Sequence, residues 1–222
     1  KDFPLFSSKC AFTDDTVLSV ATAKWLLEGN ECFRHYYELT CKYPTAGYGT
    51  GFMKWYFQIK YHKNPKPYNS CGNGSGMRVG PVGWAFDTEQ EVLYAAKISA
   101  ECTHNHPEGI KGAQAIALCI FLARHGFKES EIKQMIEEHF GYNLSMLIDE
   151  LRPHYSWHGI DGLGNGGTCQ DSVPQAIMCA LQASDFEDAI RNAISIGGDS
   201  DTIGCMTGSI AEALYGIPKS IA

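Results

Sequence analysis

The sequence has no apolar stretch as long as the roughly 18 residues that a membrane-spanning helix needs, and no signal peptide is visible at its start. It also has no C-x-x-C pair, although it contains nine cysteines, which is an odd number. These absences argue against a membrane protein, a zinc ribbon and a disulfide framework. We therefore expect free thiols, no membrane partner and a cytoplasmic location.

A basic stripe is also missing. The net charge is −7, and the lysines and arginines are scattered singly along the chain. Proteins whose main partner is a nucleic-acid backbone usually concentrate positive charge on one face. The charge pattern therefore argues against that class of protein.

Runs of alternating apolar and polar residues, which would indicate strands, are scarce, and helical periodicity dominates instead. Thr88 with Glu91 forms a capping box, and Pro107 suits a first helical position. We predict an all-α fold in one compact domain spanning 1–222. Loops are expected over 62–78 and 153–170, and helices over 14–28, 33–39, 53–59, 89–100, 107–121, 129–140, 173–184, 186–196 and 201–215.

Two acidic clusters stand at predicted helix starts, "FTDDT" near the beginning and "GGDSDTIGC" near the end. One explanation is N-capping, because Thr and Asp satisfy free amides and complement the helix dipole. One capping side chain suffices, however, and each further acid adds repulsion. A hard divalent cation explains the surplus, because Mg²⁺ and Mn²⁺ prefer carboxylate and hydroxyl oxygens. The second explanation requires the two clusters to meet in space.

Five motifs in order carry a resemblance to a known family: "FTDDT", "YNSCGNGSGMRVGPVGWAF", "THNHPEGIKGAQA", "CQDSVPQAI" and "GGDSDTIGCMTG". In this order they resemble the ADP-ribosylglycohydrolases, over nearly the whole chain. The resemblance implies a compact all-α, metal-dependent enzyme that releases ADP-ribose from a protein side chain, a nucleobase or a small molecule. Nucleic acid enters only as such a modified substrate. It also implies two Mg²⁺ or Mn²⁺ ions held by Thr13, Asp14, Asp15, Asp199, Asp201 and Thr202.

The same resemblance assigns the substrate site. "GNGSG" offers consecutive backbone amides without bulky side chains, but spacing alone is equally typical of a flexible turn. By resemblance, this segment wraps the diphosphate and inner ribose, and His104 contacts ADP-ribose. The expected substrate-binding residues are Ser70, Cys71, Gly72, Asn73, Gly74, Ser75, Gly76, Met77 and His104.

Three further histidines have simpler interpretations. His106 is expected to be structural, and His154 with His158 to line or rim a loop, because no third ligand stands at zinc spacing. The segment 157–167 is expanded relative to bacterial relatives. Since this region borders the distal cleft in the family, it bears on substrate choice.

The mechanism that the resemblance implies uses Asp15 and Asp201 as catalytic metal ligands, with another carboxylate accepting the proton from water. Relatives also carry an upstream helix with a Gly-Asp-x-x-Gly pattern and a glutamate, which residues 1–12 do not match. Three explanations are open: the segment lies upstream of this sequence, a cleaved segment or a partner supplies it, or the protein has lost it together with catalysis. An ADP-ribose-binding protein that turns over poorly is therefore the alternative. A purely structural role is disfavoured, because packing needs none of the ligands.

Overall fold

The computed structural model describes residues 1–62 and 65–221. Within these ranges the chain forms twelve helices and a single two-stranded hairpin, which confirms the all-α prediction. The helices are α1 (Asp14–Glu28), α2 (Cys32–Lys42), α3 (Thr50–His62), α4 (Gly74–Met77), α5 (Gly80–Ala85), α6 (Glu89–Glu101), α7 (Pro107–Arg124), α8 (Glu129–Phe140), α9 (Ile148–Leu151), α10 (Cys169–Leu181), α11 (Phe186–Ile196) and α12 (Ser200–Tyr215).

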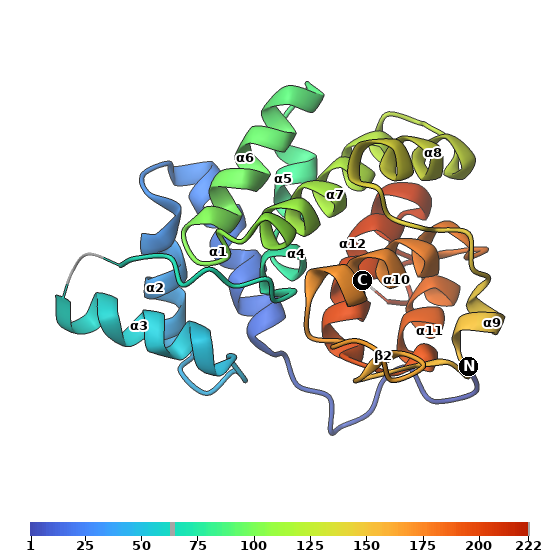
Figure 1. Ribbon diagram of the computed structural model, residues 1–222, viewed down its shortest axis with the longest axis horizontal. Coiled ribbons are helices and arrows are strands. Elements are labelled where there is room, and N and C mark those ends of the chain that lie inside the picture. The colour runs from blue at the N-terminus through green and yellow to red at the C-terminus, as the bar shows by residue number, and fades with distance from the viewer. Residues whose placement is uncertain (63–64, 222) are drawn as a thin grey trace.

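The arrangement places the first and last thirds of the chain on either side of a central group of helices (Figure 1). Helices α1, α2 and α3 lie at one end, α8 to α12 at the other, and α4 to α7 between them. An extended N-terminal segment runs past the C-terminal helices before it enters α1. None of the helices within the described ranges has both the length and the apolarity needed to cross a membrane.

The centre of the fold is α7, which packs against α4, α5, α6, α8, α10 and α12. Nearly every side chain from Gly112 to Ala123 is buried. A helix that is apolar on all sides belongs inside a protein core, which is the position it takes here. It begins as the sequence predicts, with Pro107 at its first position and His106 as its N-cap residue, whose Nδ1 accepts from the Glu108 amide at 3.1 Å.

Packing around α7 also brings the two acidic helix starts to the same region. Helix α1 contacts α4, α5 and α12, and α12 contacts α4, α5, α7, α10 and α11. The short α4 is thus shared by both. The chain's two ends, far apart in sequence, meet over the glycine-rich segment.

Several of the expected boundaries are wrong, and two short helices, α5 and α9, were not expected. Helix α3 continues to His62, and α4 lies within the expected loop 62–78. Helix α10 begins at Cys169, ahead of Pro174, whereas the expected helix began at 173. The expected loop 153–170 contains a short hairpin, in which β1 (Tyr155–Ser156) pairs antiparallel with β2 (Gly159–Ile160).

Candidate active site

Both acidic segments occupy helix N-termini without capping them. Thr13 is the N-cap residue of α1, yet its Oγ1 donates to Asp15 Oδ2 at 2.8 Å and makes no capping bond. Asp199 is the N-cap residue of α12, and its Oδ2 accepts from Asn73 Nδ2 at 2.8 Å instead of from a helix amide. Both side chains therefore bond other side chains and not the free amides of their helices. N-capping does not explain why these residues stand there.

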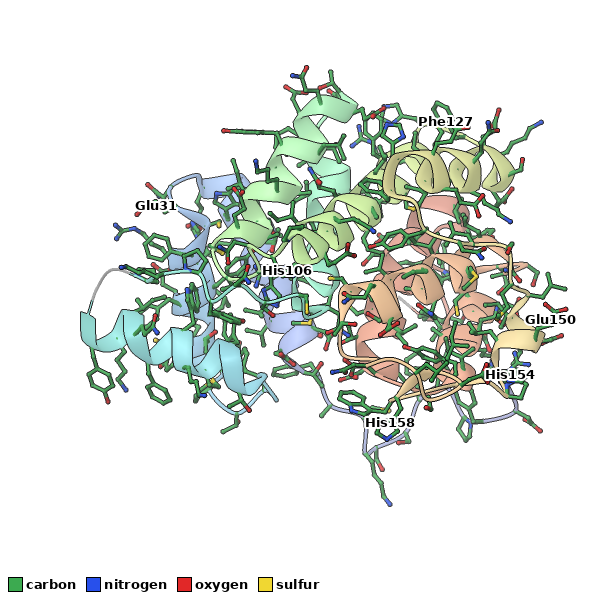
Figure 2. The ribbon with its side chains drawn as sticks, viewed as in Figure 1. Glu31, His106, Phe127, Glu150, His154 and His158 are labelled. Atoms are coloured by element: carbon green, nitrogen blue, oxygen red, sulfur yellow. The ribbon has the colours of Figure 1, made fainter. Side chains whose placement is uncertain are left out.

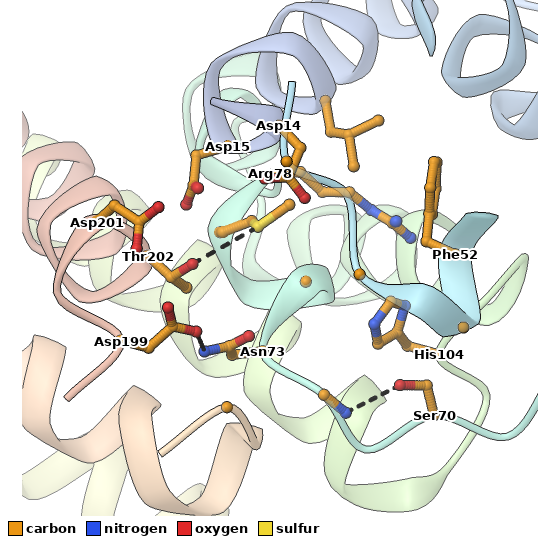
Figure 3. A pocket seen from close by; sticks show the side chains of 18 of the residues that line it. Asp14, Asp15, Phe52, Ser70, Asn73, Arg78, His104, Asp199, Asp201 and Thr202 are labelled. Carbon is orange, nitrogen blue, oxygen red and sulfur yellow. Dashed lines mark hydrogen bonds between the residues drawn. The ribbon is translucent and has the colours of Figure 1, made fainter. Parts of the chain in front are cut away.

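The two segments line one pocket of about 440 Å³ (Figure 3). Figure 3 shows the carboxylates of both segments on the same side of it, with His104 and Phe52 on the other. Thr13 is not part of the lining and acts through its bond to Asp15. The candidate metal ligands that do line the pocket are Asp14, Asp15, Asp199, Asp201 and Thr202.

The electrostatics of the pocket disfavour so many negative charges. Burial raises the pKa of Asp14 to about 7, and the charges of Asp15, Asp201 and Asp199 push it in the same direction. Burial, followed by the charge of Asp201, also raises the pKa of Asp15. For Asp199 the pKa is raised to about 6, again mainly by burial, although its hydrogen bond from Asn73 opposes the shift. Among the described residues, none of these carboxylates forms an ion pair that would offset the repulsion.

These residues suit a hard divalent cation in their chemistry. Asp15 Oδ1 is buried and has no hydrogen-bond partner in the described structure, so a ligand oxygen is left over. Carboxylate and hydroxyl oxygens are the donors that Mg²⁺ and Mn²⁺ prefer. Across residues 1–62 and 65–221, however, no group of three or more His, Cys, Asp or Glu side chains is arranged so that it could hold a metal ion. The side chains are of the types that such an ion binds, but in the described residues three or more of them are not in a coordinating arrangement.

The glycine-rich segment forms the floor of the pocket as a folded turn. The amides of Gly72, Asn73, Gly76 and Met77 are engaged internally, by Ser70 Oγ, the Gly167 carbonyl and the Asn73 carbonyl. Four of the six amides from Gly72 to Met77 are thus engaged within the fold, while the hydrogen bonds of the described residues include none from the Gly74 and Ser75 amides. The substrate-binding candidates that line the pocket are Ser70, Gly72, Asn73, Gly74, Met77 and His104.

The remaining three candidates are not among the lining residues. The Ser75 side chain is fully buried and donates to the Gly109 carbonyl at 2.7 Å. A Cβ at Gly76 would lie 2.9 Å from Met206 Sδ, so this glycine serves close helix packing. The Cys71 carbonyl accepts from the Cys169 amide at 2.9 Å and ties the turn to α10. These residues hold the turn in place from behind.

His104 stands beside the turn as a buried neutral ring. Its Nδ1 is 2.7 Å from Thr103 Oγ1, and its Nε2 would be 3.1 Å from a Cβ at Gly74. Burial, followed by the positive charge of Arg78, lowers the pKa of His104 well below its ordinary value. The ring is thus kept uncharged at neutral pH and packs against the part of the turn that lacks side chains.

The three further histidines that the sequence analysis considered, His106, His154 and His158, are labelled in Figure 2, and none of them is among the residues that line the pocket. His106 caps α7. His154 Nδ1 is 2.8 Å from Asp161 Oδ1 next to the hairpin, and His158 lies in its turn. The segment 157–167 nevertheless reaches the site, because Trp157, Asn165 and Gly167 line the pocket.

Arg78 is the main pocket residue that the sequence analysis did not single out, although it directly follows "GNGSGM". It is fully buried, with its guanidinium 4.2 Å from the centre of the Tyr36 ring. Its Nη2 donates to the Ser99 carbonyl at 2.6 Å and to Thr103 Oγ1 at 2.8 Å. Arg78 stands out as a pocket residue because it is buried, and burial cannot be read from the sequence.

Comparisons with known proteins give a consistent result. The family described as ADP-ribosylglycohydrolase matches residues 2–221. ADP-ribosylhydrolase ARH3 from Homo sapiens is 30% identical over 94% of this chain and 72% of its own length. ADP-ribosylarginine hydrolase Tri1 from Pseudomonas putida is 24% identical over 67% of this chain and 40% of its own.

Among solved structures, a chain of an ADP-ribosylglycohydrolase-related protein complex superposes with a TM-score of 0.72 at 23% identity, covering 94% of this chain and 74% of that one. This likeness supports the fold. The match to the family over almost the whole chain confirms the resemblance carried by the five motifs. The chain belongs to the ADP-ribosylglycohydrolase family and is an enzyme of that type.

Proposed function

We propose that this enzyme hydrolyses the glycosidic bond between ADP-ribose and an acceptor, with a pair of Mg²⁺ or Mn²⁺ ions held between the starts of α1 and α12. The observation that carries the proposal is the single pocket that both acidic segments line. It is supported by the unpartnered Asp15 Oδ1 and by the raised pKa values of Asp14 and Asp199. The names of the relatives support ADP-ribose as the group released.

The residues that would hold the ions are the five acid and hydroxyl residues of the lining, with Asp15 and Asp201 closest to the catalytic role. Bound divalent ions supply Lewis-acid stabilisation and lower the pKa of a coordinated water. Thr13 fixes the Asp15 carboxylate by donating to it, and Asn73 does the same for Asp199. Such outer hydrogen bonds orient ligands and tune their affinity for a metal.

The substrate side of the pocket is formed by the glycine-rich turn and His104. Gly72 and Gly74 carry no side chain, so a diphosphate can approach the backbone closely there. His104 Nδ1 faces the Thr103 hydroxyl, which leaves Nε2 beside Gly74. As a neutral ring it can hydrogen-bond a ribose hydroxyl without adding charge.

The proposal is tested by measuring ADP-ribose release with Mg²⁺ or Mn²⁺ in the wild type and in Asp201→Asn. We expect the variant to lose about 10²-fold or more in rate, the range of a missing acid–base or electrostatic group. The matched control is Asp161→Asn, which changes an exposed carboxylate outside the pocket. Equal turnover in wild type and Asp201→Asn rejects the proposal.

The alternative is a protein that binds ADP-ribose and turns it over poorly. The alternative requires only the pocket and its glycine-rich turn, and it does not require the carboxylates to gather around a metal ion. Calorimetry separates the two functions: binding of ADP-ribose in the presence of Mn²⁺, without release from any modified acceptor, supports the alternative. No heat of binding removes it.

A further inference from the structure

The charge of this chain is distributed unevenly along the sequence. No Asp or Glu occurs anywhere from residue 39 to residue 86, although the chain carries 25 acids and a net charge of −7. The same stretch contains Lys42, Lys54, Lys60, Lys63, Lys66 and Arg78. The lysines are singly spaced, as the sequence analysis noted, but the missing acids make this stretch locally basic.

Helix α3 turns part of this stretch into a continuous exposed surface. Beyond its first residue, Thr50, its exposed residues are Lys54, Phe57, Gln58, Lys60 and Tyr61, which we call the α3 surface. Positions 54, 57, 58 and 61 share one helix face, because they are three, four and seven residues apart. The opposite face of α3 is already buried, through Phe52, Trp55, Tyr56 and Ile59. Phe57 and Tyr61 are therefore not needed for the core.

The exposed rings are accompanied by unpaired positive charge. Phe57 is 43% exposed and Tyr61 is 69% exposed, and their rings stack with centroids 6.3 Å apart and planes 16° apart. Lys60 Nζ lies 6.0 Å from the centroid of the Tyr61 ring. Within the part of the chain that the structure describes, neither Lys54 nor Lys60 forms an ion pair.

The α3 surface leads away from the candidate active site. Gly51 and Phe52, in the first turn of α3, line the pocket, and so does Gly49 just ahead of it. Figure 3 shows Phe52 across the pocket from Asp199, and Figure 1 shows α3 extending to the outer edge of the molecule. At 1.5 Å per residue the helix is about 20 Å long. A chain attached to a group in the pocket can therefore follow α3 outward.

We propose that the α3 surface binds single-stranded nucleic acid, and that the acceptor of ADP-ribose is carried on such a strand. This assignment of the acceptor rests on the proposed hydrolase function. Proteins that bind single strands combine positive charge for the phosphates with exposed aromatic rings on which bases stack. An acidic protein would need the lysines but not the paired rings, and a second copy meeting this one through α3 would bring Lys54 and Lys60 against the same like-charged lysines.

The test is fluorescence anisotropy with a labelled single strand of about 10 nucleotides, titrated with the full chain over a salt series. In Lys54→Gln/Lys60→Gln we expect the salt dependence of binding to weaken by about 0.7 per lysine in the log–log slope. In Phe57→Ala/Tyr61→Ala we expect binding to fall at least about fivefold per ring. The matched control, Lys97→Gln/Lys219→Gln, removes two exposed lysines from other elements and keeps wild-type binding.

Three results overturn the proposal: no strand binding at low salt, equal binding by the α3 variants, or tighter binding of an acidic peptide than of the strand. Self-association through α3 without strand binding also overturns it. Activity is measured separately, as kcat/KM for ADP-ribose on a strand relative to a small acceptor, and the α3 variants are expected to lower this ratio about tenfold. If no acceptor releases ADP-ribose, the hydrolase proposal fails, while anisotropy still decides the α3 surface.

Discussion

At the scale of single residues, Thr13 and Asp199 show how the site departs from ordinary helix starts. Both occupy N-cap positions, where a side-chain bond to a helix amide typically contributes about 1 kcal/mol. Neither makes that bond. Their hydrogen bonds go to Asp15 and Asn73 instead, so the local stabilisation is given up to orient groups that face the pocket.

Asn73 is the residue through which the glycine-rich turn contacts the C-terminal acids. It is buried, and its Nδ2 donates to Asp199 Oδ2 at 2.8 Å and to the Gly166 carbonyl at 3.4 Å. We expect Asn73→Ala to weaken Mn²⁺ binding about 10- to 100-fold, because an outer hydrogen bond to a ligand is lost. Calorimetry measures the affinity. The exposed Asn143→Ala serves as control, and unchanged affinity in Asn73→Ala contradicts the role.

His104 gives stability a definite pH dependence. Its pKa is well below the ordinary value in the folded protein, whereas in the unfolded chain it is about 6.5. Below pH 6.5 the unfolded chain binds a proton that the folded one does not, so acid favours unfolding. Between pH 7.5 and pH 5.5 this effect amounts to about 1.4 kcal/mol.

Urea denaturation of wild type and His104→Gln at both pH values isolates that effect. The carboxylates of the pocket titrate in the opposite sense, but they are present in both proteins and cancel in the difference. We expect the wild type to lose about 1.4 kcal/mol more than His104→Gln on acidification. Identical losses would mean that the folded ring is protonated normally.

At the scale of elements, packing against α7 decides which substitutions α5 tolerates. A Cβ at Gly83 would lie 2.6 Å from Ile120 Cβ and 2.8 Å from the Ala117 carbonyl oxygen, and backbone atoms cannot move aside. We expect Gly83→Ala to destabilise the protein by about 1–3 kcal/mol, the usual cost of overpacking. Thermal or urea unfolding measures the change.

The matched substitution is Gly204→Ala in α12, whose added Cβ would lie 3.4 Å from Ile194 Cδ1, at the close limit of ordinary contact. A helical glycine replaced by alanine gains up to about 1 kcal/mol in helix propensity. Gly204→Ala is therefore expected to be neutral or stabilising. Equal effects of the two substitutions would show that propensity, not helix contact, controls both sites.

Elements with strong local signals could be predicted from the sequence, and those shaped by tertiary contacts could not. Thr88 caps α6 by accepting from the Glu91 amide, which is one half of the predicted capping box, whereas Glu91 Oε2 accepts from the Thr88 hydroxyl and not from the Thr88 amide. Pro107 begins α7 as predicted. Helix α10 was expected from 173 but begins at Cys169, ahead of Pro174. Every residue from 172 to 180 is buried, and this packing outweighs the hydrogen bond that a proline inside the helix cannot make. The four residues of α4 are too few to show a helical period in the sequence. The helix is held in place by its contacts with α7 and α12.

At the scale of the whole molecule, the site depends on the meeting of the chain's two ends. The sequence supplied the donor types at both acidic segments, and the structure places five of the six candidate ligands in one pocket. The relative position of the segments follows from α1, α4 and α12 packing around α7, which no local pattern encodes. For the same reason Arg78, which reaches the pocket from the end of α4, was not predicted.

Because α1 and α12 are far apart in the sequence, the effect of divalent cations on stability tests whether ions bind between them. If ions bind between α1 and α12, they link the two ends of the chain only in the folded state. Adding Mn²⁺ at 100 times its Kd to metal-free protein should then raise the free energy of unfolding by about 2.7 kcal/mol. Urea denaturation with and without Mn²⁺ measures the difference.

The double variant Asp14→Asn/Asp201→Asn should lose the stabilisation by Mn²⁺. Without metal, the same substitutions should raise the free energy of unfolding. Burial and mutual repulsion raise the pKa of Asp14 to about 7, so at pH 8 its charge costs stability in the metal-free protein. Removing both carboxylates relieves that cost, and we expect the variant to be more stable than metal-free wild type at pH 8. Asp161→Asn should keep the full Mn²⁺ response. A response that survives in the double variant would place the ions away from the two helix starts.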